Sequence, residues 1–127
     1  SMPWKYHDFE ETLTNPDRVY LVAEAAEADA KERILGGCML TNIAGEGDIT
    51  NVAVREQYRG RKIASALMEA LLKLGRERYG IKAFTLEVRS QNTAARNLYE
   101  KLGFVSKGVR PGFYEKPKDD AVILWKE

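Results

Sequence analysis

The chain has 127 residues, of which 44% are hydrophobic and 31% are charged, and its formal net charge is +1. These values are typical of one globular domain with one core, and a charge so near zero gives no general attraction to nucleic acid or an anionic membrane. The single cysteine, Cys38, excludes an internal disulfide, and one cysteine with one histidine argues against a Cys/His metal site. We therefore expect a cytoplasmic protein with no metal, no nucleic-acid partner and no membrane partner.

The first part of the chain predicts a short helix followed by three strands. Asp8 is placed to cap a helix over residues 8–13, which Asn15 and Pro16 would end. Alternating apolar residues predict strands at 19–24, 33–43 and 48–54. A small, charged segment (25–31) and a Gly-rich turn (44–47) join them. Because both connections are short, we expect an antiparallel meander.

The stretch from Asp48 to Tyr79 predicts a strand, a basic turn and a long amphipathic helix over residues 63–79. Apolar residues recur at helical spacing from Ile63, and Gly80 is placed to end the helix. A helix start leaves backbone N–H groups free, and these groups bind phosphate well. The positive side chains around this start are Arg55, Arg59, Arg61 and Lys62. The alternative is an ordinary strand–helix unit with a solvated basic turn.

The second half predicts a strand over residues 83–89 and a helix over 93–102, which the capping cluster Ser90-Gln91-Asn92 precedes and Gly103 ends. Strands at 104–109 and 121–125 follow, joined by a long connection over 110–120. The helix between strands 48–54 and 83–89 implies that these two strands are parallel. A ligand crevice is expected where such strands diverge, here between 51–54 and 87–89. Glu87, Asn92 and Tyr99 would border it.

Three motifs carry a resemblance to a known family. They are NVAVREQYRGRKIASALM, LEVRSQNTAARNLYEKLGF and RPGFYEKPKDDAVI. On these motifs the chain resembles the GCN5-related N-acetyltransferases (GNAT), and among them the RimI-type ribosomal-protein-alanine N-acetyltransferases. The resemblance covers nearly all of the chain from Pro3 onward. It implies an α/β fold whose mixed sheet, flanked by helices, is splayed open at its centre to hold acetyl-CoA.

The resemblance also implies where acetyl-CoA binds. The backbone of the central strand would pair with the pantetheine arm, and the turn before the long helix would hold the pyrophosphate. Lys62 stands where the family usually has Gly, which leaves the geometry of this turn open. The matching positions are Val52, Ala53, Val54, Arg59, Gly60, Arg61, Lys62, Ile63, Ala64, Ser65 and Asn92.

The family's general base corresponds to Glu87, and its general acid, which protonates the leaving thiolate, corresponds to Tyr99. The alternatives are a solvated strand residue for Glu87 and core packing for Tyr99. Phe113 and Tyr114 match an aromatic pair that lines the family's peptide entrance; a packing cluster at a strand end is the alternative.

The resemblance also predicts a departure from the family: the first strand and helix that usually precede the dipeptide matched by Pro3-Trp4 would be missing. We expect the uncovered sheet edge and apolar face to cause self-association as a homodimer. The predicted function is transfer of acetyl from acetyl-CoA to the N-terminal amine of a protein or peptide, of the ribosomal-protein type. The alternatives are a related transferase for a small amine or a lysine side chain, and a CoA-binding module with little activity.

Overall fold

The structure is a computed structural model that describes residues 4–10, 16–25, 34–60 and 62–127. This part of the chain forms one sheet with two α-helices and a short 3-10 helix, η2. The elements are β1 (Trp4–Glu10), β2 (Arg18–Ala25), β3 (Ile34–Ile43), β4 (Glu46–Val54), η2 (Glu56–Tyr58), α1 (Ile63–Tyr79), β5 (Ala83–Arg89), α2 (Thr93–Lys101), β6 (Val105–Glu115) and β7 (Lys118–Lys126).

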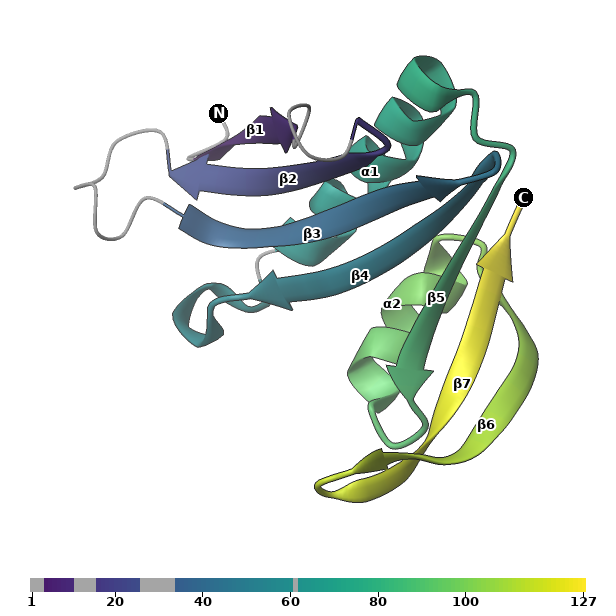
Figure 1. The fold of residues 1–127 in the computed structure, drawn as a ribbon. Coiled ribbons are helices and arrows are strands. Elements are labelled where there is room, and N and C mark those ends of the chain that lie inside the picture. The colour runs from purple at the N-terminus through teal and green to yellow at the C-terminus, as the bar shows by residue number, and fades with distance from the viewer. Residues whose placement is uncertain (1–3, 11–15, 26–33, 61) are drawn as a thin grey trace.

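The sheet has seven strands in the order β1-β2-β3-β4-β5-β7-β6 (Figure 1). Every neighbouring pair is antiparallel except β4 and β5, which are parallel and joined by α1. The predicted α/β fold, with a meander leading into one parallel step, is therefore confirmed. No helix in the described residues is long and apolar enough to span a membrane.

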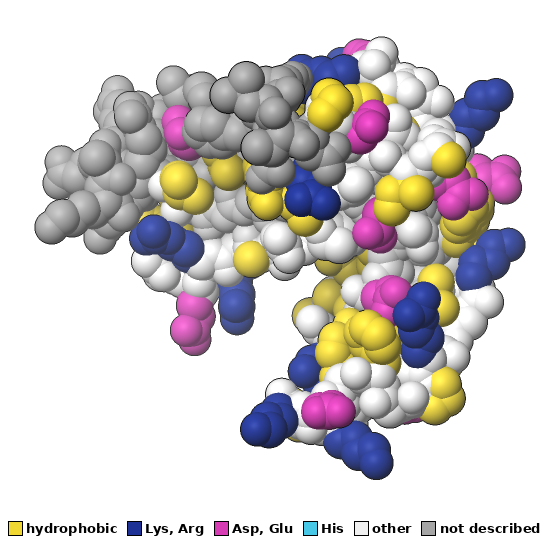
Figure 2. All heavy atoms as spheres, in the orientation of Figure 1, with side chains coloured by type: hydrophobic (Ala, Val, Ile, Leu, Met, Phe, Trp, Pro, Cys, Tyr) yellow, Lys and Arg dark blue, Asp and Glu magenta, His cyan; other side chains and the backbone are white. Residues whose placement is uncertain are grey.

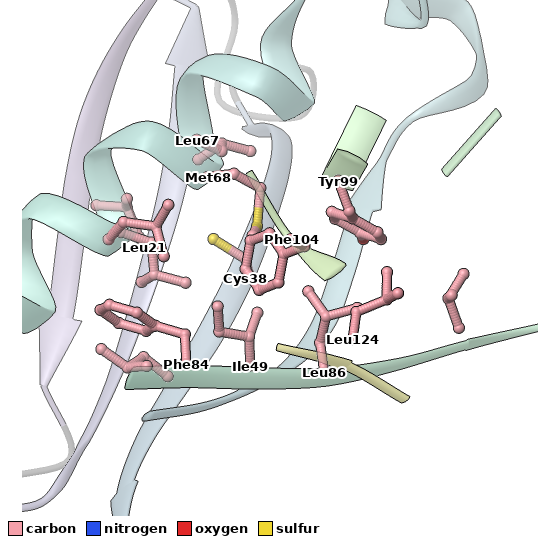
Figure 3. Packing of buried hydrophobic residues seen from close by; sticks show 14 of the residues in the cluster. Leu21, Cys38, Ile49, Leu67, Met68, Phe84, Leu86, Tyr99, Phe104 and Leu124 are labelled. Atoms are coloured by element: carbon pink, nitrogen blue, oxygen red, sulfur yellow. The ribbon is translucent and has the colours of Figure 1, made fainter. Parts of the chain in front are cut away.

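The core lies between the sheet and the two helices (Figure 3). On α1 the apolar stripe reads Ile63, Leu67 and Leu71, all fully buried, as the 3.6-residue period requires. Gly80 ends the helix in the left-handed conformation, with φ at 65°. The helix and β5 occupy the residues that the sequence predicts, since both are defined by local periodicity.

The paired ends of β4 and β5 are packed closely around one aromatic ring. A Cβ atom on Gly47 of β4 would lie 2.7 Å from Cδ1 of Phe84, and one on Gly75 of α1 would lie 2.9 Å from Cε1 of the same ring. The methyl carbons of Leu40 would lie 2.9 Å from a Cβ atom on Gly47 and 3.0 Å from one on Gly75. Such short approaches leave no room for a side chain at either position.

The structure corrects the prediction for the first strand region. Asp8 to Glu10 belong to β1 rather than to a helix, and β1 pairs with β2 along its whole length. Residues 11–15 of the predicted helix lie outside the described residues. Strand pairing outweighs local helix signals here. The sequence analysis left the outer edge of β2 uncovered, but β1 occupies this edge. An exposed β2 edge is therefore no longer a reason for self-association. The homodimer stays a prediction.

The predicted connection over residues 110–120 is also wrong, because β6 and β7 run through it as one long hairpin. Pro111 and Gly112 lie within β6, where the pairing with β7 shifts register between Arg110 and Tyr114. Since β6 is an edge strand, Pro111 is tolerated there. The hairpin brings Phe113 and Tyr114 onto the sheet.

Candidate active site

The two parallel strands part soon after they meet. They pair at Glu46–Ala83, Gly47–Phe84 and Asp48–Thr85, and diverge beyond these pairs. Figure 1 shows β4 and β5 opening apart, and Figure 2 shows the surface hollowed between the two limbs of the molecule. A cavity of about 330 Å³, here called the splay cavity, lies between the strands where the sequence placed the crevice. It is lined by Ile49, Thr50, Asn51, Val52, Leu86, Glu87, Val88, Arg89, Asn92, Ala95, Tyr99 and Tyr114.

A β-bulge bends β4 at this cavity. Met39 pairs with Thr50 and Gly37 pairs with Ala53, so two residues of β4 lie opposite one residue of β3. Asn51, one of the two, takes a left-handed conformation with φ at 57°. Past Asp48, no strand of the described residues pairs with β4 on its β5 side. The backbone groups that point to this side can therefore bind an extended ligand as an added strand.

A second cavity, of about 650 Å³, lies at the start of α1 and is here called the helix-start cavity. Lys62 is the N-cap residue of α1 and makes no side-chain capping bond, and the first turn has no acidic residue. The first N–H groups of the helix are thus open to an anion. The wall from β4, the turn and α1 consists of Val54, Tyr58, Arg59, Gly60, Lys62, Ile63, Ala64 and Ser65.

The structure separates the predicted cofactor residues into these two cavities. Val52 and Asn92 line the splay cavity. The predicted cofactor residues that line the helix-start cavity are Val54, Arg59, Gly60, Lys62, Ile63, Ala64 and Ser65, whereas Arg55 lines neither cavity. Ala53 lines neither, and Arg61 lies outside the described residues. Asn92 also caps α2, because its Oδ1 accepts a hydrogen bond from the Ala95 N–H at 3.1 Å.

Lys62 settles the geometry of the turn that the sequence left open. It adopts φ 60° and ψ 21°, the left-handed conformation that favours glycine. Gly60, two residues earlier, also has a positive φ of 80°. The guanidinium of Arg59 is turned back toward β4, where its Nε donates to the Val54 carbonyl at 3.3 Å.

Tyr99 is held by the core. It lies on α2, is 6% exposed and meets Phe104 edge to face, with ring centroids 5.9 Å apart. Figure 3 shows Phe104 in the middle of the cluster, beside Cys38, with Tyr99 next to it. Burial, and to a smaller extent the nearby Cys38, raises the pKa of Tyr99 to about 12. Its phenol therefore stays protonated at neutral pH and can donate a proton or a hydrogen bond into the splay cavity.

Glu87 lies on the opposite face of β5 from the buried Leu86 and Val88, with 31% of its side chain exposed. Its Oε1 is 3.6 Å from a guanidinium nitrogen of Arg110 on β6. Burial first, and the charge of Glu87 second, raise the pKa of Asp48. The same two causes lead the raised pKa of Tyr114. A partly shielded carboxylate thus faces the cavity from β5.

The β6–β7 hairpin walls the splay cavity through Tyr114. The guanidinium of Arg89 lies 4.2 Å from the centre of the Tyr114 ring and donates to the Pro117 carbonyl at 2.7 Å. Phe113 meets Tyr114 edge to face at 5.1 Å but is 49% exposed and does not line the cavity. The two rings of the predicted aromatic pair are thus in contact, but only Tyr114 lines the cavity.

Asp119 fixes the hairpin to the junction of β5 and α2. Its carboxylate accepts hydrogen bonds from the Ser90 hydroxyl and from the Gln91 and Asp120 N–H groups. The bond from Ser90 is the main cause of its lowered pKa. The sequence reasoning missed both Asp119 and Arg89. Asp119 fell in the predicted connection over residues 110–120, and Arg89 was treated only as a residue of its strand.

The sequence reasoning also missed Asp48 and Thr50 on β4. The Thr50 hydroxyl is buried and has no hydrogen-bond partner among the described residues. Strand alternation places both side chains on the same face of the sheet as Glu87. The predicted parallel pairing of the two strands could therefore have indicated both residues from the sequence. The described residues contain no group of three His, Cys, Asp or Glu side chains that could hold a metal ion.

A mixed sheet that opens between two parallel strands beside an uncapped helix start is the architecture that the motifs implied. The model of the acetyltransferase (GNAT) family matches residues 1–104, and the chain belongs to this family. A Bacillus subtilis (strain 168) protein provisionally named ribosomal protein bS18-alanine N-acetyltransferase is 32% identical over 124 residues, which cover 97% of this chain and 78% of that protein. An N-alpha-acetyltransferase from Sulfurisphaera tokodaii is 33% identical over 123 residues, covering 91% of this chain and 74% of that protein.

Among solved structures, the ribosomal-protein-S18-alanine N-acetyltransferase from Escherichia coli matches with a TM-score of 0.76 and 25% identity, covering 90% of this chain and 71% of that one. The predicted family, fold and class of enzyme, an N-acetyltransferase, are therefore confirmed.

Proposed function

We propose that this protein transfers acetyl from acetyl-CoA to the N-terminal α-amine of a protein or peptide, and that a ribosomal protein is an acceptor of this class. One observation carries the proposal: the splay cavity and the helix-start cavity lie along the same segment of β4, the first at Val52 and the second at Val54. Val54 lines the helix-start cavity, where the free N–H groups of α1 can take an anion, and Val52 lines the splay cavity together with Glu87 and Tyr99. The names of the Bacillus subtilis and Sulfurisphaera tokodaii relatives support an N-terminal acceptor.

The donor would span both cavities. Its pyrophosphate would bind the free N–H groups of Ile63, Ala64 and Ser65, with Lys62 adding positive charge. Its pantetheine arm would lie along the unpaired side of β4 from Val54 to Val52, hydrogen-bonded as an added strand. This direction places the thioester in the splay cavity.

Glu87 would prepare the acceptor. An α-amine has a pKa of roughly 8, so most of it is ammonium at neutral pH and cannot attack. Glu87 would take one proton, directly or through a water molecule, and the nitrogen would then form a bond with the thioester carbonyl carbon. A backbone N–H of the 52–54 segment is placed to stabilise the oxyanion that develops.

Tyr99 would complete the transfer. When the carbon–sulfur bond breaks, the phenol gives its proton to the departing thiolate. The extra proton left on nitrogen then restores the phenol, so that the products are an amide, CoA with a free thiol, and one proton released through Glu87. The buried position of Tyr99, which keeps it protonated, suits this role.

The acceptor would approach along the face that carries Glu87. Tyr114 lines that side of the cavity, and the exposed Phe113 contacts Tyr114 from outside the lining. Arg89 and Asp119 hold the hairpin in place, so they would position this wall without touching the acceptor. We also propose a cytoplasmic location, on the composition argument given by the sequence.

The test is thioester consumption with matched acceptors. The purified chain is mixed with acetyl-CoA and, separately, with peptides of varied first residue, the same peptides with blocked N-termini, a peptide with an internal lysine, and a polyamine. We expect turnover with free N-termini alone. Preference for the lysine or the polyamine would support a different acceptor class, and donor binding without any turnover would support a CoA-binding module.

A further inference from the structure

One face of α2 runs along the helix-start cavity beyond the part assigned to pyrophosphate. Ala94, Asn97, Leu98 and Lys101 all line this cavity and follow the i, i+3, i+4, i+7 spacing of a single helical face. From Ala94 to Lys101 the helix rises by roughly 10 Å. The cavity is therefore longer than a pyrophosphate requires, and it ends at a positive side chain.

The adjacent face of α2 serves the other cavity. Asn92, Ala95 and Tyr99 line the splay cavity, where the thioester would react. With the thioester on that face and the pyrophosphate at Ile63, the nucleotide of the donor remains to be placed. The cavity wall that is still free is the α2 stripe ending at Lys101.

The ammonium of Lys101 is available for an anion. It forms no ion pair with any carboxylate of the described residues. It also lines a neighbouring groove of about 450 Å³ that contains Lys73, Arg76 and Lys126 together with Glu69 and Glu77. Arg76 is engaged elsewhere, because its guanidinium lies 5.3 Å from the Phe84 ring centre and donates to the Glu127 carbonyl. Lys101 is thus the cation shared by the groove and the donor cavity.

Coenzyme A differs from its dephospho form by one dianionic phosphate on the ribose 3′ oxygen. We propose that Lys101 binds this 3′-phosphate and makes the enzyme prefer CoA thioesters over dephospho-CoA thioesters. This assignment rests on the proposed use of acetyl-CoA. A helical lysine in the last turn also stabilises the helix by its charge, and that role alone would affect both donors equally.

The test compares two donors on two variants. Acetyl-CoA and acetyl-dephospho-CoA are titrated by calorimetry and used as substrates, with the wild type and with Lys101→Gln. We expect the wild type to prefer acetyl-CoA about tenfold in Kd and in kcat/KM, the size of one charge-assisted contact. Lys101→Gln should lose most of that preference while its Kd for acetyl-dephospho-CoA stays within about twofold.

Lys107→Gln is the matched control, because Lys107 is an exposed lysine on β6 that lines none of the cavities described above. It should leave the preference intact. Equal weakening of both donors by Lys101→Gln, or an unchanged preference, overturns the assignment. A wild type that binds both thioesters equally overturns the Lys101 site alone, whereas one that binds neither overturns the proposed function as well.

Discussion

Lys62→Gly should make the protein more stable while weakening its hold on acetyl-CoA. Lys62 adopts φ 60° and ψ 21° at the start of α1. For a residue with a Cβ this left-handed conformation costs about 1–2 kcal/mol. Glycine removes that cost but increases the freedom of the unfolded chain, which takes back about 0.4–1 kcal/mol. The net gain in the free energy of unfolding then lies between about 0 and 1.6 kcal/mol, and its midpoint of about 0.8 kcal/mol corresponds to roughly 3 °C in Tm for a domain of this size.

Urea unfolding, followed by circular dichroism, measures this gain. Lys73→Gly is the matched control, since Lys73 is an exposed lysine within α1 and the same replacement there should cost about 1 kcal/mol. Calorimetry at two salt concentrations measures the second effect. The variant lacks one positive charge beside the helix-start cavity, so its affinity for acetyl-CoA should fall and depend less on salt.

The opposite signs of the two effects make the reasoning testable. A loss of stability at Lys62→Gly as large as that at Lys73→Gly would show that Lys62 carries no backbone strain. Stabilisation with unchanged affinity for acetyl-CoA would keep the strain but remove Lys62 from the phosphate site.

Four further predictions concern the site. Tyr99→Phe keeps the ring contact with Phe104 and should leave Tm nearly unchanged, but turnover should fall about 10²–10⁴-fold with no recovery as pH is raised; full turnover would exclude Tyr99 as the acid. Glu87→Gln should lose a similar factor and regain part of it at higher pH, because the amine then arrives deprotonated; a wild-type rate at neutral pH with a good peptide would return Glu87 to a solvated strand residue. Arg59→Glu should weaken acetyl-CoA binding and flatten its salt dependence, and calorimetry that finds the wild-type affinity would contradict the site. The lowered pKa of Asp119 means that its carboxylate contributes stability above its unfolded pKa, near 4, and loses that contribution as pH falls through the folded value; Asp119→Asn should therefore unfold with a weaker pH dependence below pH 5 in thermal melts, and melts that keep the wild-type slope would refute this.

The features that the sequence predicted well are those that local periodicity and caps define. The long helix, with Gly80 at its end, and the strand that holds Glu87 were predicted to the residue, because their signals lie within one element. The second helix was also placed correctly, and its N-cap, Asn92, belongs to the predicted capping cluster. Motif positions then pointed to Glu87 and Tyr99, which both line the splay cavity.

The features that were missed depend on contacts between distant segments. The strand β1 forms because every one of its residues pairs with β2, and the sequence of residues 4–10 alone does not indicate this pairing. The hairpin was missed because Pro111 and Gly112 suggest a loop, while the pairing of Tyr114 with Asp119 keeps the chain in the sheet. The same non-local contacts hide the positioning roles of Arg89 and Asp119.

The close contact of Gly47 and Gly75 with the Phe84 ring has a mechanical consequence for the far end of the two strands. The relative position of β4 and β5 is fixed where they pair, since a Cβ atom at either glycine would have to displace the ring. From Asp48 to Val54 the part of β4 beyond this pairing is roughly 20 Å long. A rotation of about 3° at the paired ends would therefore move its tip by about 1 Å, an error that can cost about a hundredfold in rate. A methyl group added at Gly47 or Gly75, at the paired ends of the strands and away from either substrate, is thus expected to disturb the alignment of the reacting atoms.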